Sequence, residues 1–344
     1  MAVDIAEQPE VYARLLDRDR ASAVASVAAA IVARAPRYVV VAGRGTSDNA
    51  ALYVAYLCQI RLGLPAGLAS PSVVTLFGAR PDLSAALVIG VSQSGGSPDL
   101  VEVLQAARAT GAMTLAITND PGSPLATTAE LALDIAAGPE RAVAATKTYT
   151  AELLTLLMLV EGVRSGDGTL PPSERASLAV LPELAALTLA DPAAPELAAR
   201  YRFADRLVAT GRGYGYPTAK EAALKLMETS YLAALPFSGA DLLHGPLAMT
   251  DPAVPVLAVV GDGPGGRAMR EVLARLGERH ADVVTVSPRP APGATAHLRV
   301  PALEERVAPL LDVLPLQRLA LALALARGED PDTPRGLDKV TTTR

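Results

Sequence analysis

The chain has 344 residues, enough for two domains of ordinary size, and half of them are hydrophobic, which predicts a large buried core. Its net charge of −5 argues against nucleic acid as a partner, because binding a phosphate backbone requires a basic face. The single cysteine, Cys58, excludes an intrachain disulfide and a cysteine-based metal site. No uninterrupted apolar run or signal-peptide core indicates a membrane protein. We therefore expect a soluble, cytoplasmic protein that needs no metal or cofactor.

Apolar strand-like runs alternate with helical runs along the first half of the chain. The predicted strands are Tyr38–Ala42, Ala85–Val91 and Met113–Thr118, and the predicted helices are Asn49–Leu62, Leu100–Thr110 and Thr148–Val163. The strands are almost continuously apolar, as expected when both faces of a sheet are buried. This rhythm predicts an α/β fold with a parallel sheet and helices on both faces.

Between the strand Ala85–Val91 and the helix that begins near Pro98 lies the segment SQSGGS. The helix presents free backbone N–H groups and the positive end of its dipole to this loop. Its glycines permit close approach, and four side chains add uncharged donors, namely Ser92, Gln93, Ser94 and Ser97. A plain strand–turn–helix corner would also contain serine and glycine. The number of polar side chains favours a site for a phosphate carried on a small molecule.

The pattern restarts in the second half. The segment VVVAGRGTSDNAALYVAYL (39–57) is echoed by RLVATGRGYGYPTAKEAALKL (206–226), and a second glycine-rich turn, GDGPGG (261–266), lies where SQSGGS lies in the first half. Two landmarks in register indicate a duplicated α/β unit. We predict a first domain over 1–164, a linker over 165–200 with a helix near 177–189, a second domain over 201–330 and a tail over 331–344.

The two copies differ in their loops. The second loop has no hydroxyl and contains Asp262, which would repel an anion, so only the first half is expected to hold phosphate. The turn Gly43–Gly45 has Asp48 where a dinucleotide fingerprint has its third glycine, which argues against a nicotinamide site. Ser47, just after this turn, is either a simple helix cap or a further ligand of the same anion.

The second half carries titratable side chains on a mostly apolar helix, Lys220–Leu232. Glu221, Lys225 and Glu228 share one face of this helix. A solvated charge ladder is the plain interpretation, whereas burial among the apolar neighbours would suit a general base. His244, in the loop DLLHGPLAM, has either a structural or a catalytic role.

The C-terminal segment DTPRGLDKVTTTR (332–344) follows a predicted helix over Val307–Arg327. Its polar, proline- and glycine-marked composition is typical of a disordered tail. Leu337 and Val340 on either side of Lys339 would instead allow the tail to be anchored over a site.

Taken together, the motifs resemble the sugar isomerase (SIS) superfamily, in particular its double-SIS sugar-phosphate enzymes. The similarity runs nearly end to end, through EQP, GRGTSDNA, SQSGGSPD, ERAVAATKTYTAEL, KEAALKLMET, LLHGPLAM and PDTPRGLDKVTTT. It is greatest to the SIS-type glucosamine-6-phosphate deaminases and to the isomerase half of glutamine–fructose-6-phosphate amidotransferase. The resemblance implies two tandem flavodoxin-like SIS subdomains.

The resemblance also implies roles for individual residues. Glu228 matches the base that moves a proton between C1 and C2, and His244 matches a ring-opening histidine that relatives donate from the neighbouring subunit of a homodimer. Lys339 matches a tail lysine near C2 of the sugar, and Lys225 matches a lysine on the Glu228 helix. The phosphate loop is matched by Ser92, Gln93, Ser94 and Ser97, with Ser47 beside it. Asp241 departs from the glutamate that is usual there.

These roles predict conversion of glucosamine 6-phosphate, or a related hexosamine phosphate, to fructose 6-phosphate and ammonia. The sequence begins Met1-Ala2 rather than with the cysteine nucleophile of a glutaminase, so we expect no glutaminase activity. The alternatives are another SIS isomerase, a fructosamine-phosphate deglycase, ammonia-dependent glucosamine-6-phosphate synthesis, or a sugar-phosphate sensor without catalysis.

Overall fold

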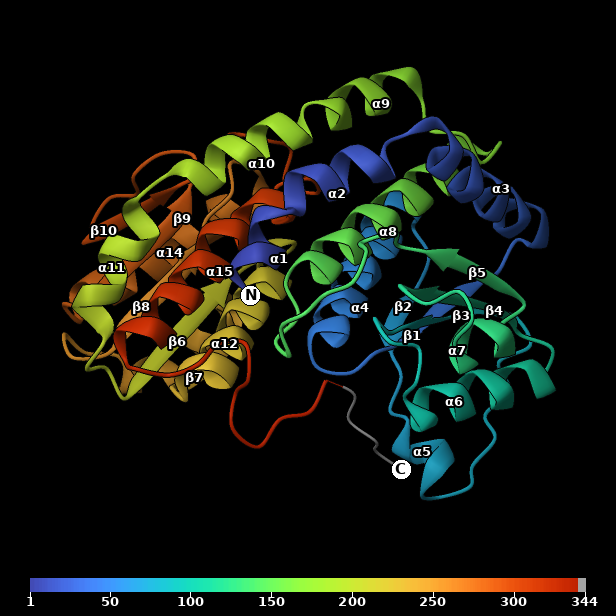
Figure 1. The fold of residues 1–344 in the computed structure, drawn as a ribbon, viewed down its shortest axis with the longest axis horizontal. Coiled ribbons are helices and arrows are strands. Elements are labelled where there is room, and N and C mark those ends of the chain that lie inside the picture. The colour runs from blue at the N-terminus through green and yellow to red at the C-terminus, as the bar shows by residue number, and fades with distance from the viewer. Residues whose placement is uncertain (340–344) are drawn as a thin grey trace. The chain divides into compact units, whose positions relative to one another are not determined.

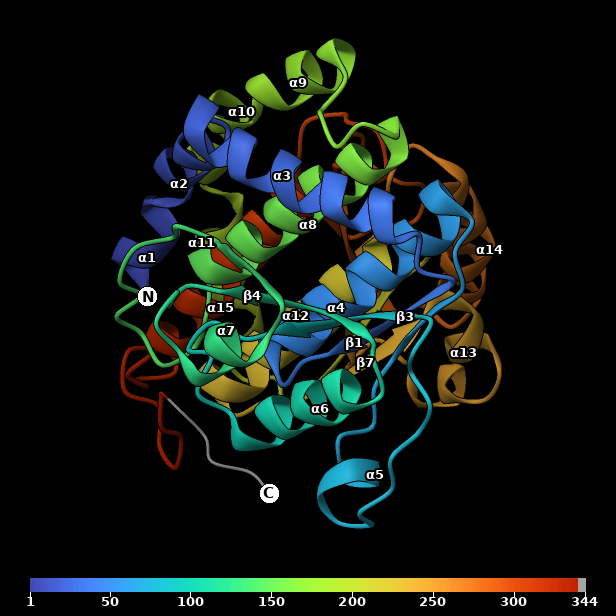
Figure 2. The ribbon, with the colours of Figure 1, turned by 90° about the vertical axis from the view of Figure 1, so that its right-hand side faces the viewer.

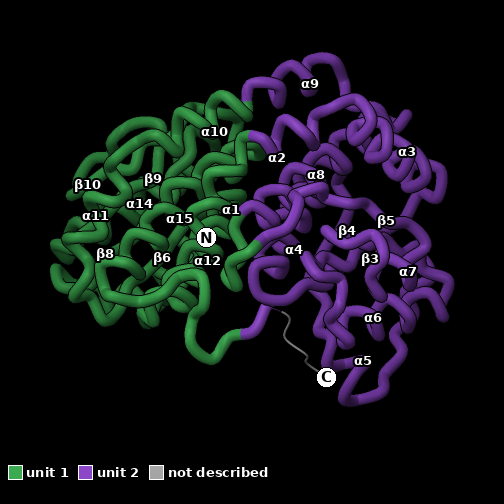
Figure 3. The backbone as a smooth tube through the Cα atoms, in the orientation of Figure 1, with its two compact units in different colours: residues 1–9, 141–146, 181–337 green, residues 10–140, 147–180, 338–344 purple. Residues whose placement is uncertain are grey.

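The computed structural model describes residues 1–339 and contains two compact units, each built on a five-stranded parallel sheet (Figures 1 and 3). Unit 1 comprises residues 1–9, 141–146 and 181–337, and unit 2 comprises residues 10–140 and 147–180 together with the chain from Asp338. The predicted α/β class and its duplication are confirmed.

The sheet of unit 2 has the strand order β2-β1-β3-β4-β5. Its strands are β1 (Tyr38–Ala42), β2 (Ala66–Leu68), β3 (Ala86–Val91), β4 (Met113–Thr118) and β5 (Leu131–Asp134). β3 and β4 are buried at every position, which explains their unbroken apolar sequences. The predicted strands therefore agree with the structure to within one residue.

Helices cover both faces of this sheet (Figure 2). One face carries α3 (Arg18–Arg34), α4 (Thr46–Leu57) and α8 (Lys147–Ser165), and the other carries α5 (Ser72–Thr75), α6 (Pro98–Ala109) and α7 (Pro124–Thr128). α4 continues into a π-helical turn, η1 (Cys58–Leu62). Cys58 is buried there, and burial raises the pKa of its thiol to about 12, so it is an inert core residue.

Unit 1 repeats the topology with the strand order β10-β9-β8-β6-β7. Its strands are β6 (Arg206–Gly211), β7 (Ala233–Ser238), β8 (Pro255–Val259), β9 (Asp282–Ser287) and β10 (Ala296–Arg299). β6 corresponds to β1 and β8 to β3, because each pair occupies the same place in its sheet. The two glycine-rich turns noted in the sequence therefore follow equivalent strands.

The helices of unit 1 also form two layers. On one face lie α11 (Ala193–Tyr201), α12 (Gly215–Ser230) and α15 (Pro309–Ala326), and on the other lie α13 (Gly239–Leu243), η2 (Pro246–Met249) and α14 (Pro264–Glu278). The N-terminal helices are α1 (Ala2–Ala6) and α2 (Gln8–Leu15).

The predicted linker over 165–200 is more helical than its sequence indicated. It contains α9 (Pro172–Ala179), α10 (Leu181–Ala190) and the start of α11, where we expected one helix near 177–189. The proline and alanine content concealed these helices, since prolines at the first turns of α9 and α10 start helices rather than interrupt them.

Among the described residues, α15 is long and apolar enough to cross a membrane by length and composition, although 72% of that stretch is buried inside the fold. Within unit 1 it packs against α10, α11 and α12. Near the start of α15, the side chain of Asp312 is buried. This burial and the negative charge of Glu305 together hold the pKa of the Asp312 carboxyl well above its usual range. The folded protein therefore favours the protonated form of Asp312.

This shift predicts a stability that falls as pH rises. The contribution of Asp312 is fully present below the unfolded pKa, near 3.8, and is lost as pH rises toward the higher folded pKa. Asp312→Asn should remove this loss and raise the unfolding midpoint at pH 8 by about 2–4 °C, the shift produced by roughly 1 kcal/mol in a domain of about 150–250 residues. Thermal unfolding of both proteins at pH 5 and pH 8 checks this, and a variant less stable than wild type at pH 8 contradicts it.

Candidate functional site

The phosphate-binding loop predicted from the sequence lies at the topological switch point of unit 2. β1 leads to β2 on one side and β3 leads to β4 on the other, so the crevice opens where the carboxyl ends of β1 and β3 meet. Two loops follow these strand ends, namely Gly43–Gly45 after β1 and Ser92–Ser97 after β3. This is the position at which ligands bind in open α/β sheets.

Two serines of the loop use their oxygens internally and keep their protons for a ligand. The Ser92 hydroxyl accepts a hydrogen bond from the Gly95 amide at 3.1 Å, and that of Ser94 accepts one from the Gly96 amide at 3.3 Å. A hydroxyl carries one proton besides its acceptor lone pairs. Both groups can therefore donate to an anion while they keep the loop in shape.

The other two predicted ligands, Gln93 and Ser97, have half-buried side chains. Within the described residues these side chains make no hydrogen bond. Ser97 occupies the N-cap position of α6, but its hydroxyl accepts no hydrogen bond from the backbone amides of the helix. The Gln93 carbonyl is fixed instead, because it accepts from the Asn119 amide at 3.1 Å and from the Thr118 hydroxyl at 3.3 Å. The structure thus brings all four predicted loop residues together, with donors left for a ligand.

Gly95 is required for both conformation and space. Its φ of +60° lies in the left-handed region, and a Cβ added there would lie 2.1 Å from the Ser123 hydroxyl oxygen. The Gly95 carbonyl also accepts from the Leu125 amide at 3.0 Å, which ties the loop to α7.

An ion pair that sequence reasoning missed lies at the start of α6. Arg44, from the turn after β1, places its Nε 2.8 Å and one Nη 2.7 Å from the same oxygen of Asp99. The other oxygen of Asp99 accepts from the Leu100 amide at 2.9 Å. Asp99 is fully buried, so without Arg44 its charge would oppose an incoming phosphate. Asp99 follows the segment SQSGGS by two residues, and this position in the sequence could have identified it as part of the site.

Ser47 is the one predicted phosphate ligand whose hydroxyl is already engaged. It is buried in the first turn of α4 and donates to Glu152 at 2.8 Å, while its amide donates to the Arg44 carbonyl at 3.1 Å. A hydroxyl has a single proton to give. In this geometry Ser47 orients Glu152, and it would have to turn away from Glu152 to donate to phosphate.

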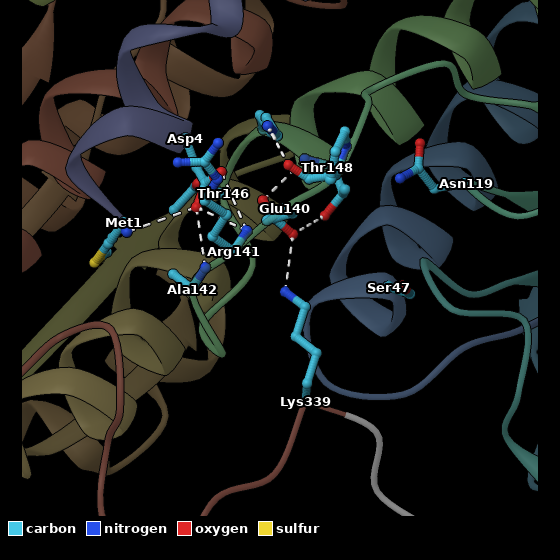
Figure 4. Close-up of polar contacts among 12 residues, drawn as sticks. Met1, Asp4, Ser47, Asn119, Glu140, Arg141, Ala142, Thr146, Thr148 and Lys339 are labelled. Atoms are coloured by element: carbon cyan, nitrogen blue, oxygen red, sulfur yellow. Dashed lines mark hydrogen bonds and ion pairs between the residues drawn. The ribbon is translucent and has the colours of Figure 1, made fainter.

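The predicted tail lysine is anchored within unit 2 (Figure 4). The Lys339 ammonium lies 3.4 Å from a carboxylate oxygen of Glu140. The same carboxylate accepts from the Thr148 hydroxyl at 2.5 Å and from the Thr148 amide at 3.2 Å. Of the two apolar anchors predicted for the tail, Leu337 is 42% exposed, and Val340 lies outside the described residues with the rest of the tail to Arg344.

Asn119 fixes the loop that carries Glu140. Its amide nitrogen donates to the Gly138 carbonyl at 2.8 Å, and its side-chain oxygen accepts from the Ala137 amide at 2.9 Å. Neither Asn119 nor Glu140 was predicted as a site residue. Glu140 stood in the quoted motif ERAVAATKTYTAEL, whereas nothing in the sequence marked Asn119.

In unit 1, three charged side chains of α12 lie together, namely Glu221, Lys225 and Glu228. Lys225 is 1% exposed, and its ammonium pairs with Glu228 and lies 3.4 Å from an oxygen of Glu221. The Glu221 side chain is fully buried and that of Glu228 is 22% exposed. The solvated ladder considered above is therefore wrong, and Glu228 is the carboxylate that solvent reaches.

His244 lies apart from this cluster in the local packing of unit 1. α12 packs on α15 and on β6, β7 and β8, whereas α13, which ends just before His244, packs on α14 and η2 as well as on β6 and β7. The His244 ring is exposed and makes no hydrogen bond among the described residues. Ser238 caps α13: its hydroxyl accepts from the Asp241 amide at 3.2 Å and donates to the Asp241 carboxylate at 2.7 Å.

The hollow over β1 and β2 is not lined by any of these residues. This hollow has a volume of about 600 Å³ and is lined by the segments 37–40 and 65–68 and by Ala85. Residues 1–339 contain no group of three or more His, Cys, Asp or Glu side chains placed to hold a metal ion.

Comparison with known proteins decides the family. Residues 33–162 and 201–327 match the SIS domain. The chain belongs to the SIS domain family. It is 34% identical over 351 residues to a glutamine–fructose-6-phosphate aminotransferase (isomerizing) of Pyrobaculum aerophilum, with 99% of this chain and 57% of that protein covered. A protein of the same name from Gloeobacter violaceus is 37% identical over 317 residues, with 87% of this chain and 50% of that protein covered. The chain thus spans about half the length of these relatives.

Solved structures agree with this assignment. A candidate phosphosugar isomerase of Silicibacter pomeroyi is 35% identical with a TM-score of 0.88, covering 96% of this chain and 98% of that one. A glucosamine-6-phosphate deaminase of Thermotoga maritima shares the fold at 20% identity, with a TM-score of 0.76 and 99% of both chains covered. The resemblance read from the motifs is therefore confirmed for the double-SIS family.

The role of Gly95 can be tested against a matched glycine. Gly111 has a φ of +85°, and a Cβ there would meet nothing within 4 Å, so Gly111→Ala introduces backbone strain without a clash. That strain costs about 1–3 kcal/mol. Gly95→Ala should lower the unfolding midpoint further than Gly111→Ala and should abolish binding of inorganic phosphate, which Gly111→Ala retains. Calorimetric titration and thermal unfolding measure both effects. Equal phosphate affinity in the two variants contradicts the assigned loop geometry.

Proposed function

We propose that this protein is an amino-sugar-phosphate deaminase and isomerase, which converts glucosamine 6-phosphate or a related hexosamine phosphate to fructose 6-phosphate and ammonia. The family and the donor-rich loop of unit 2 support binding of a sugar phosphate. The observation that carries catalysis is the buried Lys225 ammonium, which pairs with the partly exposed Glu228 carboxylate. Phosphate binding alone has no need of such a pair.

In the proposed reaction, the loop Ser92–Ser97 holds the 6-phosphate. The open-chain sugar has an aldehyde at C1 and an amine at C2. Glu228 removes the C2 proton and returns it to C1, while a second proton passes from the amine nitrogen to the C1 oxygen. The aldehyde carbon thereby becomes an alcohol and C2 becomes an imine. Water then hydrolyses the imine to the ketone and ammonia. Binding energy from the remote phosphate positions the reacting carbons, so loop substitutions should lower turnover as well as affinity.

The lysines have supporting roles in this proposal. The Lys225 ammonium stabilises the charged carboxylate that Glu228 presents before it takes the C2 proton and again after it returns the proton to C1. Lys339, which is paired with Glu140, is held ready to approach C2 of the sugar.

The remaining group, His244, is assigned to ring opening across a homodimer. Its exposed ring has no partner among the described residues, which fits a side chain offered to a second copy of the chain. Exposed apolar side chains in unit 2, including Leu76 at 66% and Phe77 at 80%, provide surface that such a dimer would bury.

An ammonia-release assay tests the function directly. Purified protein is incubated with glucosamine 6-phosphate, galactosamine 6-phosphate and a fructosamine 6-phosphate, and ammonia and the ketose phosphate are measured. We expect ammonia and fructose 6-phosphate in equal amounts from glucosamine 6-phosphate. Binding of fructose 6-phosphate without ammonia release from any substrate would instead identify a sensor.

Glu228→Gln should lower turnover by about 10²–10⁴-fold, the usual contribution of a general base. The affinity for fructose 6-phosphate should change little, because the phosphate loop belongs to the other unit. Initial rates and calorimetric titration separate the two effects. Turnover within a few-fold of wild type would show that another group moves the proton.

The Arg44–Asp99 pair gives an independent prediction about binding. Arg44→Gln leaves a buried negative charge at the start of α6, and KM for the sugar phosphate should rise by about tenfold, which corresponds to about 1.4 kcal/mol. The double variant Arg44→Gln with Asp99→Asn should recover most of this loss, because the unpaired charge is gone. A double variant as weak as the single one would show that Arg44 acts by direct contact with phosphate instead.

A further inference from the structure

The second glycine-rich loop, which follows β8, already holds an anion supplied by the chain itself. The Glu305 carboxylate accepts a hydrogen bond from the Gly266 amide at 2.6 Å and one from the Gly265 amide at 3.1 Å. These amides belong to the first turn of α14, where backbone N–H groups have no partner within the helix. Glu305 thus binds where a phosphate would bind at this helix.

The glycines of this loop make room for that carboxylate. A Cβ added to Gly261 would lie 3.0 Å from the Glu305 side chain, one at Gly263 would lie 2.5 Å from it, and one at Gly265 would lie 3.0 Å from it. Three glycines of the segment GDGPGG therefore pack closely against the Glu305 side chain. Removing this side chain would open a space lined by backbone and by two free amides.

The position is equivalent to the phosphate loop of unit 2. β8 and β3 hold the same place in their sheets, and each leads into a helix that starts with proline, Pro264 in α14 and Pro98 in α6. In unit 2 the corresponding amide, that of Leu100, donates to Asp99 of the same helix. In unit 1 the residue after the proline is Gly265, so the carboxylate comes from a distant loop.

That distant loop is itself duplicated. Glu305 lies six residues after the end of β10, and Glu140 lies six residues after the end of β5; each is followed by arginine. Glu140 is held by Thr148 and Lys339, whereas Glu305 turns into the glycine loop. The same glutamate of the repeat therefore has different partners in the two units.

Asp262, which the sequence indicated as the group that repels an anion, does not fill the loop. Its carboxylate is 43% exposed and lies 3.5 Å from Arg289. The expectation that the second loop holds no phosphate thus has a different physical basis, since its donors are already used by Glu305.

We propose that Glu305 is a built-in anion that closes the second cradle to phosphate, so that each chain binds one sugar phosphate, in unit 2. The assignment of the open cradle rests on the proposed function, whereas the closed cradle stands on the geometry of unit 1. A phosphate entering unit 1 would have to displace a tethered carboxylate that is always present at high effective concentration.

Phosphate stoichiometry tests this proposal. Inorganic phosphate is titrated into wild type, Glu305→Ala and the control Glu304→Ala, whose side chain is 67% exposed and pairs with Arg306 outside the loop. We expect one phosphate per chain for wild type and for Glu304→Ala, and two for Glu305→Ala. Crystals of Glu305→Ala soaked in phosphate should show the second ion on the amides of Gly265 and Gly266.

A background of Ser92→Ala with Ser94→Ala separates the two units. In this background, the variant that also carries Glu305→Ala should still bind one phosphate, in unit 1. The variant that retains Glu305 should bind phosphate at least tenfold more weakly. If wild type binds none but Glu305→Ala binds one, the proposed function fails and the closed cradle stands. Equal stoichiometry in wild type and Glu305→Ala overturns the proposal. Two phosphates per wild-type chain overturn it as well, and that measurement does not depend on whether the variants fold.

Discussion

In each unit, a helix follows the third strand of the sheet, and the backbone amides of its first turn need hydrogen-bond acceptors from outside the helix. These N–H groups have no partner in their own helix, and they face the crevice where strand ends diverge. In unit 2, the carboxylate of Asp99 takes one amide, Arg44 balances its charge, and polar side chains around it remain available. In unit 1, Glu305 takes two amides. One backbone arrangement thus gives an open cradle and a filled one.

The choice between these outcomes is made by the loops after the last strands. Glu140 and Glu305 occupy equivalent places, so backbone position alone does not decide where their carboxylates go. The Glu140 carboxylate accepts two hydrogen bonds from Thr148 and pairs with the Lys339 ammonium. These interactions stabilise its position. Glu305 meets a loop whose glycines leave space for it. A few side chains around a duplicated glutamate therefore separate the tasks of the two units.

Much of the fold could be predicted because buried parallel strands have unmistakable sequences. β1 and β4 coincide with the predicted ranges, and the donor-rich loop after β3 lies at the expected crevice. The hydrogen bonds that join distant residues around the site could not be predicted in the same way. Glu305 lies about forty residues from the amides that it binds, and Asn119 fixes the Glu140 loop across a strand connection. Such pairings arise from tertiary structure, and neither composition nor periodicity records them.

The cluster on α12 shows how burial distinguishes two carboxylates on one face of the same helix. The Lys225 ammonium lies between the Glu221 and Glu228 carboxylates. Glu221 is fully buried, and a buried carboxylate without a cation would be costly, so Lys225 is needed there for the fold itself. Glu228 is partly exposed, so its carboxylate keeps contact with solvent as well as with Lys225. Burial thus commits Glu221 to the fold and leaves Glu228 as the accessible carboxylate of the two.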